Sequence, residues 1–137
     1  METERTEELK NASSEQLALT AVKILIEKKA IDVKLYDVRG TAAITDFYII
    51  ATGKSSTHVA SLAGDVDYFL NMKGKPSERI EGKKGNSWLL IDYIDVIVNV
   101  FDKESRAFYN FERLMPEGSL VDISDIIAEV DKKFGVK

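Results

Sequence analysis

Residues 46–70 read DFYIIATGKSSTHVASLAGDVDYFL, and this stretch decides the fold. Its first part, 46–52, is an apolar run rich in β-branched and aromatic residues, typical of a strand covered on both faces. After the turn at 53–56, apolar residues recur at three- and four-residue steps and predict an amphipathic helix. These residues are Val59, Leu62, Ala63, Val66, Phe69 and Leu70. A buried strand that leads directly into such a helix indicates an α/β domain.

The turn GKSS at 53–56 is similar to the end of a phosphate-binding P-loop, but the first glycine of that loop is missing. The motif G-x-x-x-x-G-K-[ST] needs a glycine five positions before Gly53, where Tyr48 stands. Ser55 and Ser56 fit helix caps, because a serine oxygen accepts hydrogen bonds from backbone N–H groups at a helix start. Anion binding by those N–H groups stays open as the alternative. Gly74 is expected to end the helix.

Upstream, the sequence predicts a leader, a helix and a strand. Residues 1–12 are highly charged and are expected to form a flexible leader. Ser13 and Gln16 form a capping box for a helix over about 14–29. The next stretch, 31–38, alternates apolar and polar residues as a strand does. Its expected common face carries Ile31, Val33 and Leu35.

Downstream, a short strand is predicted at 77–81. The stretch SWLLIDYIDVIVNVF at 87–101 is long enough for two strands with a bend near Tyr93, because its β-branched and aromatic residues favour a pleated surface. A helix is expected after Asp102 and is interrupted by Pro116, and one more helix follows. The recurring apolar residues of these helices are Phe108, Phe111, Leu114 and Met115, then Ile123, Ile126, Ile127, Val130 and Phe134.

The chain has 137 residues, of which 45% are hydrophobic and 31% charged, and this composition fits one soluble globular domain. The order of elements predicts an α/β fold with a mixed central β-sheet of about five strands flanked by helices. Residues 13–116 are expected to form the domain proper, and 117–137 a C-terminal helical extension.

The net charge of −4 argues against a broad nucleic-acid surface, because such affinity comes from many cations that neutralise phosphates. A small basic cluster allows a contact with RNA beside a protein partner, or is simply solvated. It comprises Lys73, Lys75, Arg79, Lys83 and Lys84. The lack of cysteine excludes disulfides. The lack of a secretory signal and of a long apolar segment predicts a cytoplasmic protein without a membrane span.

No set of residues predicts catalysis, a metal or a cofactor. A nucleotidyl-transfer site needs carboxylates that converge on metal ions. Asp65 and Asp67 lie on the predicted helix, where side chains two residues apart diverge by about 200°. Asp92 and Asp95 are spaced by three, so a straight strand sends them to opposite faces, and an acidic rim or a bend fits them better. His58, the only histidine, falls in the first helical turn, where a polar surface residue is ordinary.

Trp88 and Tyr93 bracket the apolar residues LLI, and Asp92 and Asp95 stand beside them. One interpretation is that both aromatic residues fill and edge the core. The other is a protein interface, in which large rigid groups are buried while the acids select a basic partner. The residues alone leave both open.

Four segments together resemble the ribosomal silencing factor family, also called the Iojap family. They are DVRGTAAITDFYIIATGKSSTHV (37–59), RIEG (79–82), SWLLIDYIDVIVNVF (87–101) and ESRAFYNFERLM (104–115). The resemblance runs from about residue 13 to residue 116. Several ordered motifs match at once, which is far more specific than any one of them.

This resemblance implies a fold related to nucleotidyltransferases but without their catalytic acids, and hence no enzyme. It implies binding to the large ribosomal subunit through ribosomal protein L-fourteen, at the face meant for the small subunit. The bound factor would block subunit joining and repress translation, and the free protein would form a homodimer. The alternatives are a large-subunit assembly factor that touches ribosomal RNA through Lys83 and Lys84, and a degenerate nucleotidyltransferase.

The resemblance also implies a set of partner-binding residues. The W-x-x-x-D-Y-x-D segment contributes Trp88, Asp92, Tyr93 and Asp95, the neighbouring strand contributes Arg79 and Glu81, and the G-x-S-S turn contributes Ser55 and Ser56. An acidic, aromatic surface of this kind suits a basic ribosomal protein and raises the association rate through charge complementarity.

Two residues depart from the family pattern, which has glycine at the position of Ile94 and histidine at that of Asn99. A positive φ is costly for a β-branched residue, so the hairpin is expected to turn differently here. Ile94 is therefore left out of the predicted interface. The segment after Pro116 lies outside the resemblance, and no function is assigned to it.

Overall fold

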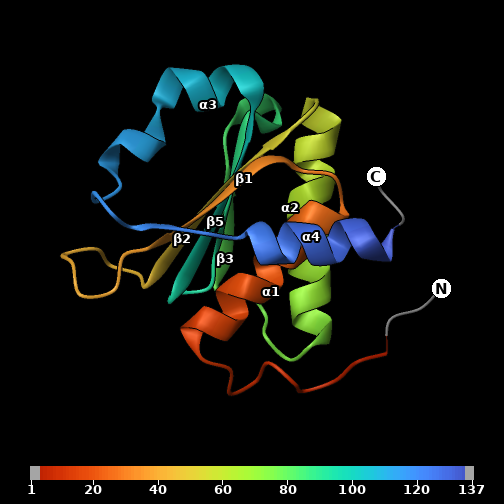
Figure 1. Ribbon diagram of the computed structural model, residues 1–137. Coiled ribbons are helices and arrows are strands. Elements are labelled where there is room, and N and C mark those ends of the chain that lie inside the picture. The colour runs from red at the N-terminus through yellow and green to blue at the C-terminus, as the bar shows by residue number, and fades with distance from the viewer. Residues whose placement is uncertain (1–3, 135–137) are drawn as a thin grey trace.

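A six-stranded mixed sheet, with its two longest helices on one face, forms the centre of the computed structural model, which describes residues 4–134 (Figure 1). The helices are α1 (Ser14–Glu27), α2 (Ser56–Met72), α3 (Lys103–Tyr109) and α4 (Ser124–Lys133). The strands are β1 (Ile31–Asp37), β2 (Phe47–Gly53), β3 (Arg79–Gly82), β4 (Trp88–Asp92), β5 (Val96–Asp102) and β6 (Leu120–Val121). Two 3-10 helices, η1 (Lys84–Asn86) and η2 (Phe111–Leu114), lie in the connections.

The strand order is β3-β4-β5-β2-β1-β6. Only the central pair, β2 and β5, is parallel, and every other neighbour is antiparallel. The predicted α/β class with a mixed sheet is confirmed. The sheet has six strands instead of about five, because Leu120 and Val121 add a short strand beside β1. A part of the predicted helical extension therefore belongs to the sheet.

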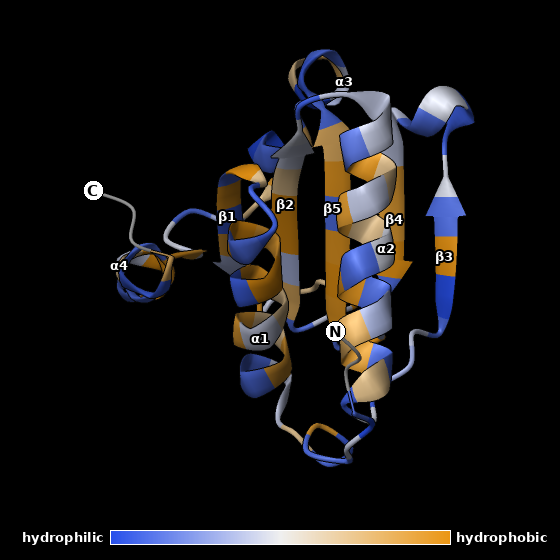
Figure 2. Ribbon diagram, turned by 90° about the vertical axis from the view of Figure 1, so that its right-hand side faces the viewer, coloured by the Kyte–Doolittle hydropathy of each residue, from blue (hydrophilic) through white to orange (hydrophobic). Residues whose placement is uncertain are grey.

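One face of the sheet is covered by α1 and α2, which lie side by side across it (Figure 2). Alternate residues of the central strands point to this layer and form the main core, among them Ile49 and Val98. Both helix starts are capped as predicted, since Ser13 Oγ accepts from Gln16 N at 3.0 Å and Ser55 Oγ accepts from His58 N at 3.1 Å.

The turn between β2 and α2 is held by local packing and hydrogen bonds. A Cβ atom on Gly53 would lie 2.8 Å from both Cγ2 and N of Val59, so glycine allows α2 to start close to the strand. His58 Nδ1 accepts from Lys54 N at 2.9 Å, and its Nε2 lies 3.1 Å from the carbonyl oxygen of Lys28 at the end of α1. The histidine thus ties the turn to α1.

The other face of the sheet carries an aromatic layer. Tyr36, Ile50 and Phe101 are buried there, and η2 places Phe111 edge-on to Tyr48 at a centroid distance of 5.4 Å. This layer covers β1, β2 and β5, whereas Arg79 and Glu81 on β3 remain exposed.

Arg106 fastens the aromatic layer to the sheet. Its guanidinium donates two hydrogen bonds to Glu112, at 3.0 and 2.8 Å, and one to Thr52 Oγ1 at 2.9 Å. A fourth runs to the carbonyl oxygen of Asp32 at 2.7 Å. Arg106 is buried, so these acceptors compensate the cost of removing its charge from water. The network joins α3, η2, β1 and β2.

Several sequence expectations are wrong in detail. Ile31 does not share a face with Leu35, because an irregularity between Ile31 and Lys34, with Asp32 at φ 50°, shifts the alternation by one residue. The helix after Asp102 does not continue to Met115. It ends at Asn110, which adopts the left-handed conformation that asparagine tolerates, and η2 follows.

A third expectation concerns the flexible leader. Thr6 N and Leu9 N donate to the carbonyl oxygens of Met72 and Lys73, at 2.7 and 2.9 Å. Leu9 is 1% exposed and belongs to the main core. The segment from Thr6 to Ala12 therefore packs over the end of α2, while residues 1–3 lie outside the described residues.

The turn between β4 and β5 keeps a conformation suited to glycine although isoleucine occupies it. Ile94 has φ 73°, so the expectation of a different turn is wrong. Asp92 Oδ1 accepts a hydrogen bond from Ile94 N at 2.7 Å, which fixes the turn. The Ile94 side chain is 58% exposed and makes little packing in return for this strained conformation.

Glu112→Gln tests the Arg106 network. Hydrogen bonds from Arg106 hold the pKa of Glu112 below its ordinary value of 4.5. A carboxylate with a lowered pKa stabilises the fold above its unfolded pKa, and this contribution is lost as pH falls through the folded pKa. We expect a loss of about 2 kcal/mol in unfolding free energy at neutral pH. Urea unfolding should show the gap to wild type narrowing below pH 4.5. The exposed Glu117→Gln is the control, and a gap that does not change with pH would contradict the assignment.

Ile94→Gly should stabilise the protein. Glycine removes the steric cost of the left-handed conformation but adds flexibility to the unfolded chain, so we expect a net gain of about 1 kcal/mol. Urea unfolding of the two proteins measures it. A less stable glycine variant would show that Ile94 is not strained.

Candidate functional site

Four of the eight predicted partner-binding residues lie on one face of the sheet. Trp88 and Asp92 are four residues apart on β4, and Arg79 and Glu81 are two apart on β3, so each pair points to one side. The register sets Arg79 opposite Asp92 and Glu81 opposite Leu90, which puts both pairs on the same side. This is the side away from α1 and α2, and we call it the β3–β4 face: Arg79, Glu81, Trp88, Leu90 and Asp92.

Trp88 is held rigidly but is not enclosed. Its ring stacks on Phe101 at a centroid distance of 4.7 Å and an interplanar angle of 29°. Its Nε1 donates to Asn99 Oδ1 at 3.0 Å, and Asn99 itself is fully buried. The indole remains partly exposed. Asn99 thus fixes the orientation of the indole.

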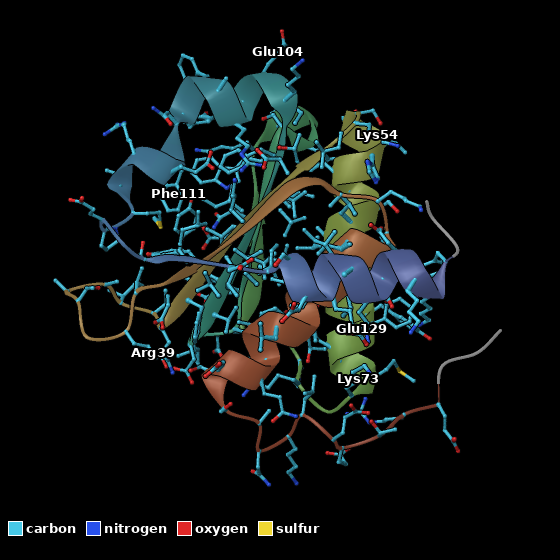
Figure 3. The ribbon with its side chains drawn as sticks, viewed as in Figure 1. Arg39, Lys54, Lys73, Glu104, Phe111 and Glu129 are labelled. Carbon is cyan, nitrogen blue, oxygen red and sulfur yellow. The ribbon has the colours of Figure 1, made fainter. Side chains whose placement is uncertain are left out.

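Two further aromatic residues extend this surface, and sequence reasoning did not assign them to it. Tyr109 tilts against Trp88 at 4.9 Å, and Phe108 meets Tyr109 edge-on at 5.1 Å. Phe108 is 81% exposed, although its spacing had suggested a buried helix face. Phe111, labelled in Figure 3, lies on the sheet side of η2, with its ring 6.1 Å from Trp88. We call Trp88, Tyr109 and Phe108 the aromatic ridge.

A shallow hollow of about 250 Å³ lies beside Trp88. It is lined by Glu81, Gly82, Lys83, Trp88 and Leu90. Its wall combines an indole and a leucine with one carboxylate and one ammonium group. Such a hollow can receive a partner side chain with an apolar stem and a charged end.

The charges on the β3–β4 face are already paired. Arg79 Nε lies 2.7 Å from Glu81 Oε2, and its Nη2 lies 3.2 Å from Asp92 Oδ2. Asp92 is buried and also holds the Ile94 turn. Exposed ion pairs such as Arg79–Glu81 contribute little to stability, so a partner cation is able to take the place of Arg79 beside Glu81 at low cost while Arg79 stays paired with Asp92. The face is therefore aromatic, with one cation set between two carboxylates, and its charges are largely engaged with one another.

The other four predicted residues are not brought to this face. Tyr93 is 3% exposed and lies in the core beneath the helices, where burial and the nearby Asp67 raise its pKa. Asp95 is exposed in the β4–β5 turn. Ser55 caps α2 and Ser56 is its first residue, so both lie at the start of a helix on the opposite layer.

A larger hollow, of about 810 Å³, lies between α1 and α4. Its lysines pair with its own acids: Lys23 with Glu129 at 3.0 Å, and Lys133 with Glu27 at 3.2 Å. Glu129 is labelled in Figure 3 on α4. The third lysine of the groove, Lys73, lies 3.5 Å from Glu8, so each lysine in its lining has a partner acid within the chain.

Within residues 4–134, no three acidic, histidine or cysteine side chains gather as metal ligands would. Over the same part of the chain, none of the helices combines the length and the apolarity needed to cross a membrane.

Comparison with known proteins assigns the chain to one family. The family described as "ribosomal silencing factor during starvation" matches residues 11–135. The chain is 34% identical over 116 residues to the ribosomal silencing factor of Halalkalibacterium halodurans, covering 85% of this chain and 99% of that protein. A mouse protein named for mitochondrial assembly of the ribosomal large subunit is 28% identical, covering 79% of this chain and 49% of that one.

A crystal structure of a Chromobacterium violaceum protein has a similar fold. It superposes with a TM-score of 0.72 at 27% identity, covering 80% of this chain and 93% of the other. The matched family region extends from before α1 to the end of α4 and includes the β3–β4 face. The chain belongs to the ribosomal silencing factor family.

Proposed function

We propose that this protein binds the large ribosomal subunit in the cytoplasm through the β3–β4 face and the aromatic ridge. Family membership supports a role at the ribosome. The observation that carries the proposal is the convergence of Trp88 with Arg79, Glu81 and the exposed Phe108 on one side of the sheet. Large rigid aromatic groups of this kind dominate the binding energy of protein interfaces.

The proposed contact on the subunit is ribosomal protein L-fourteen, a basic protein at the face that meets the small subunit. A lysine or arginine of that protein would lay its apolar stem along Trp88 and Leu90 in the hollow, with its charge next to Glu81. Because Glu81 is now paired with Arg79 on the surface, this exchange costs little.

The proposed effect needs only the bulk of the bound protein. A folded domain seated where the small subunit docks keeps the two subunits apart, and translation falls. No covalent bond is made or broken in this proposal. The protein acts by occupying the docking site of the small subunit and not as an enzyme.

Purified ribosomal subunits test this function directly. Sedimentation of large and small subunits at saturating factor should show separate subunits where the untreated mixture forms whole ribosomes. Whole ribosomes that form unimpeded while the factor stays bound to the large subunit would reject the proposed block. A factor that does not bind the large subunit would reject the proposed partner as well.

Phe108→Ala is the sharper test of the interface. The side chain is 81% exposed, so its loss should leave the unfolding free energy close to wild type while affinity for the large subunit falls about tenfold. Phe134→Ala, at the exposed residue that follows α4, is the matched control and should bind normally. Trp88→Ala is a less clean variant, because it leaves buried Asn99 without its donor.

A second role, in assembly of the large subunit, is favoured by the name of the mouse relative. Contact with ribosomal RNA through Lys83 and Lys84 would then add to binding. In that case, affinity should fall steeply with salt, and Lys83→Ala/Lys84→Ala should flatten this dependence. A salt dependence that the double variant leaves unchanged would reject the RNA contact.

We also propose that the free protein forms a homodimer through the edge of β3. Lys83 N donates to Trp88 O at 2.9 Å, so alternation along the ladder turns the backbone groups of Ile80 and Gly82 outward. Antiparallel pairing of two copies centred on Ile80 would set Arg79 opposite the Glu81 of the second copy. An exposed strand edge of this kind readily pairs with another chain.

Ile80→Pro tests this edge. Proline removes an outward N–H without breaking the β3–β4 ladder, so we expect a monomer in sedimentation equilibrium where wild type dimerises. Thermal unfolding at low concentration serves as the control for folding. A proline variant that still forms dimers would move the contact elsewhere.

A further inference from the structure

The β4–β5 turn and the β1–β2 connection meet at one end of the sheet. Asp46 N and Phe47 N both donate to the carbonyl oxygen of Asp95, at 3.0 and 3.2 Å. Ile44 stands two residues before Asp46, and Ile94 stands one before Asp95. These hydrogen bonds hold the two loops together at this end of the sheet, and we call five of its residues the turn end: Ile44, Asp46, Glu78, Ile94 and Asp95.

Two isoleucines are displayed at the turn end without packing of their own. Ile44 is 86% exposed and Ile94 is 58% exposed. Ile94 is moreover held at positive φ by the hydrogen bond from its N–H to Asp92, in a conformation that disfavours a β-branched residue. Strain that the free protein does not offset by packing is a pointer to a contact made elsewhere.

The acidic groups around these isoleucines are not ion-paired, whereas the cations near them are. Asp46, Glu78 and Asp95 make no ion pair with any residue in the part of the chain that the structure describes. The nearby cations are engaged: Arg39 with Asp37 at 2.7 Å, and Arg79 with Asp92 at 3.2 Å. The turn end is therefore acidic in a way that the β3–β4 face is not. Three carboxylates repel nucleic-acid phosphates and attract a basic protein segment.

The turn end also continues the β3–β4 face. Asp92 belongs to that face, and its carboxylate bonds both Arg79 and the Ile94 turn. Glu78 N donates to Asp92 O at 2.7 Å, which places Glu78 at the start of β3 beside the same turn. A partner that covers Trp88 reaches the turn end after the length of β4, about 13 Å.

We propose that Ile44 and Ile94 form an apolar contact, ringed by Asp46, Glu78 and Asp95, that seats a basic segment of the ribosomal protein bound by the β3–β4 face. This inference rests on the proposed function. In this proposal the Ile94 side chain raises the affinity for the ribosomal protein. Its strained backbone conformation lowers the stability of the free protein.

The test measures the affinity of the full chain for purified large subunits together with its unfolding by urea. Ile94→Gly and Ile94→Asn keep the turn and remove the exposed methyl groups, and each should bind about tenfold more weakly while unfolding at the same or higher urea concentration. Ile44→Ser should weaken binding to a similar degree. Ile127→Ser on α4 removes an isoleucine of similar exposure far from the surface and should leave affinity unchanged.

The outcomes separate the two proposals. If both Ile94 variants bind with wild-type affinity, the turn-end contact is overturned. If Phe108→Ala loses affinity in the same experiment, the proposed function still holds. Failure of the wild-type chain to bind large subunits overturns both. Asp95→Asn combined with Glu78→Gln should lower affinity for a basic protein. A rise in affinity instead identifies RNA at this end and overturns the contact.

Discussion

The parallel pair β2 and β5 lies in the middle of the sheet, and both of its faces have to be shielded from water. Nearly every residue of these two strands is buried, which is the condition under which parallel strands occur in proteins. The layer of α1 and α2 meets this need on one side. On the other side no long helix is present among residues 4–134, and the aromatic layer of η2 and its neighbours does the covering.

The different coverage of the two faces explains where the candidate surface lies. The aromatic layer ends over β5, so Trp88 on the next strand is stacked on its inner side and open on its outer side. Arg106 anchors the segment that carries Phe108, Tyr109 and Phe111, because its four hydrogen bonds join α3 and η2 to β1 and β2. The segment that carries the ridge is therefore held in place in the free protein, and a preordered segment lowers the entropy cost of the proposed binding.

Much of this was predictable from local pattern. The strand-turn-helix unit at 46–70, the capping serines and the β4–β5 hairpin all follow from periodicity and turn chemistry. Alternation alone also separates Tyr93 from Trp88 and Asp92, since an odd spacing sends it to the other face. The resemblance grouped the three residues because a sequence motif does not say to which face of the sheet each side chain points.

The remaining features depend on contacts between distant segments. The irregularity at Asp32 brings its carbonyl oxygen to Arg106, 74 residues away. The alternation of apolar and polar residues within the strand contains no information about such a distant contact. Phe108 and Phe111 share a helical spacing, yet the left-handed Asn110 between them turns one to solvent and the other to the sheet. The short strand β6 has only two residues and carries almost no pattern.

Trp88 is the only tryptophan in the chain. Its indole is clamped by Asn99 and Phe101 on one side and open on the other. The indole of Trp88 is therefore an intrinsic fluorescent probe of the β3–β4 face. A change in the polarity around this one ring shifts the entire tryptophan emission. The proposed binding at that face can be followed without a label, from the shift in the emission wavelength.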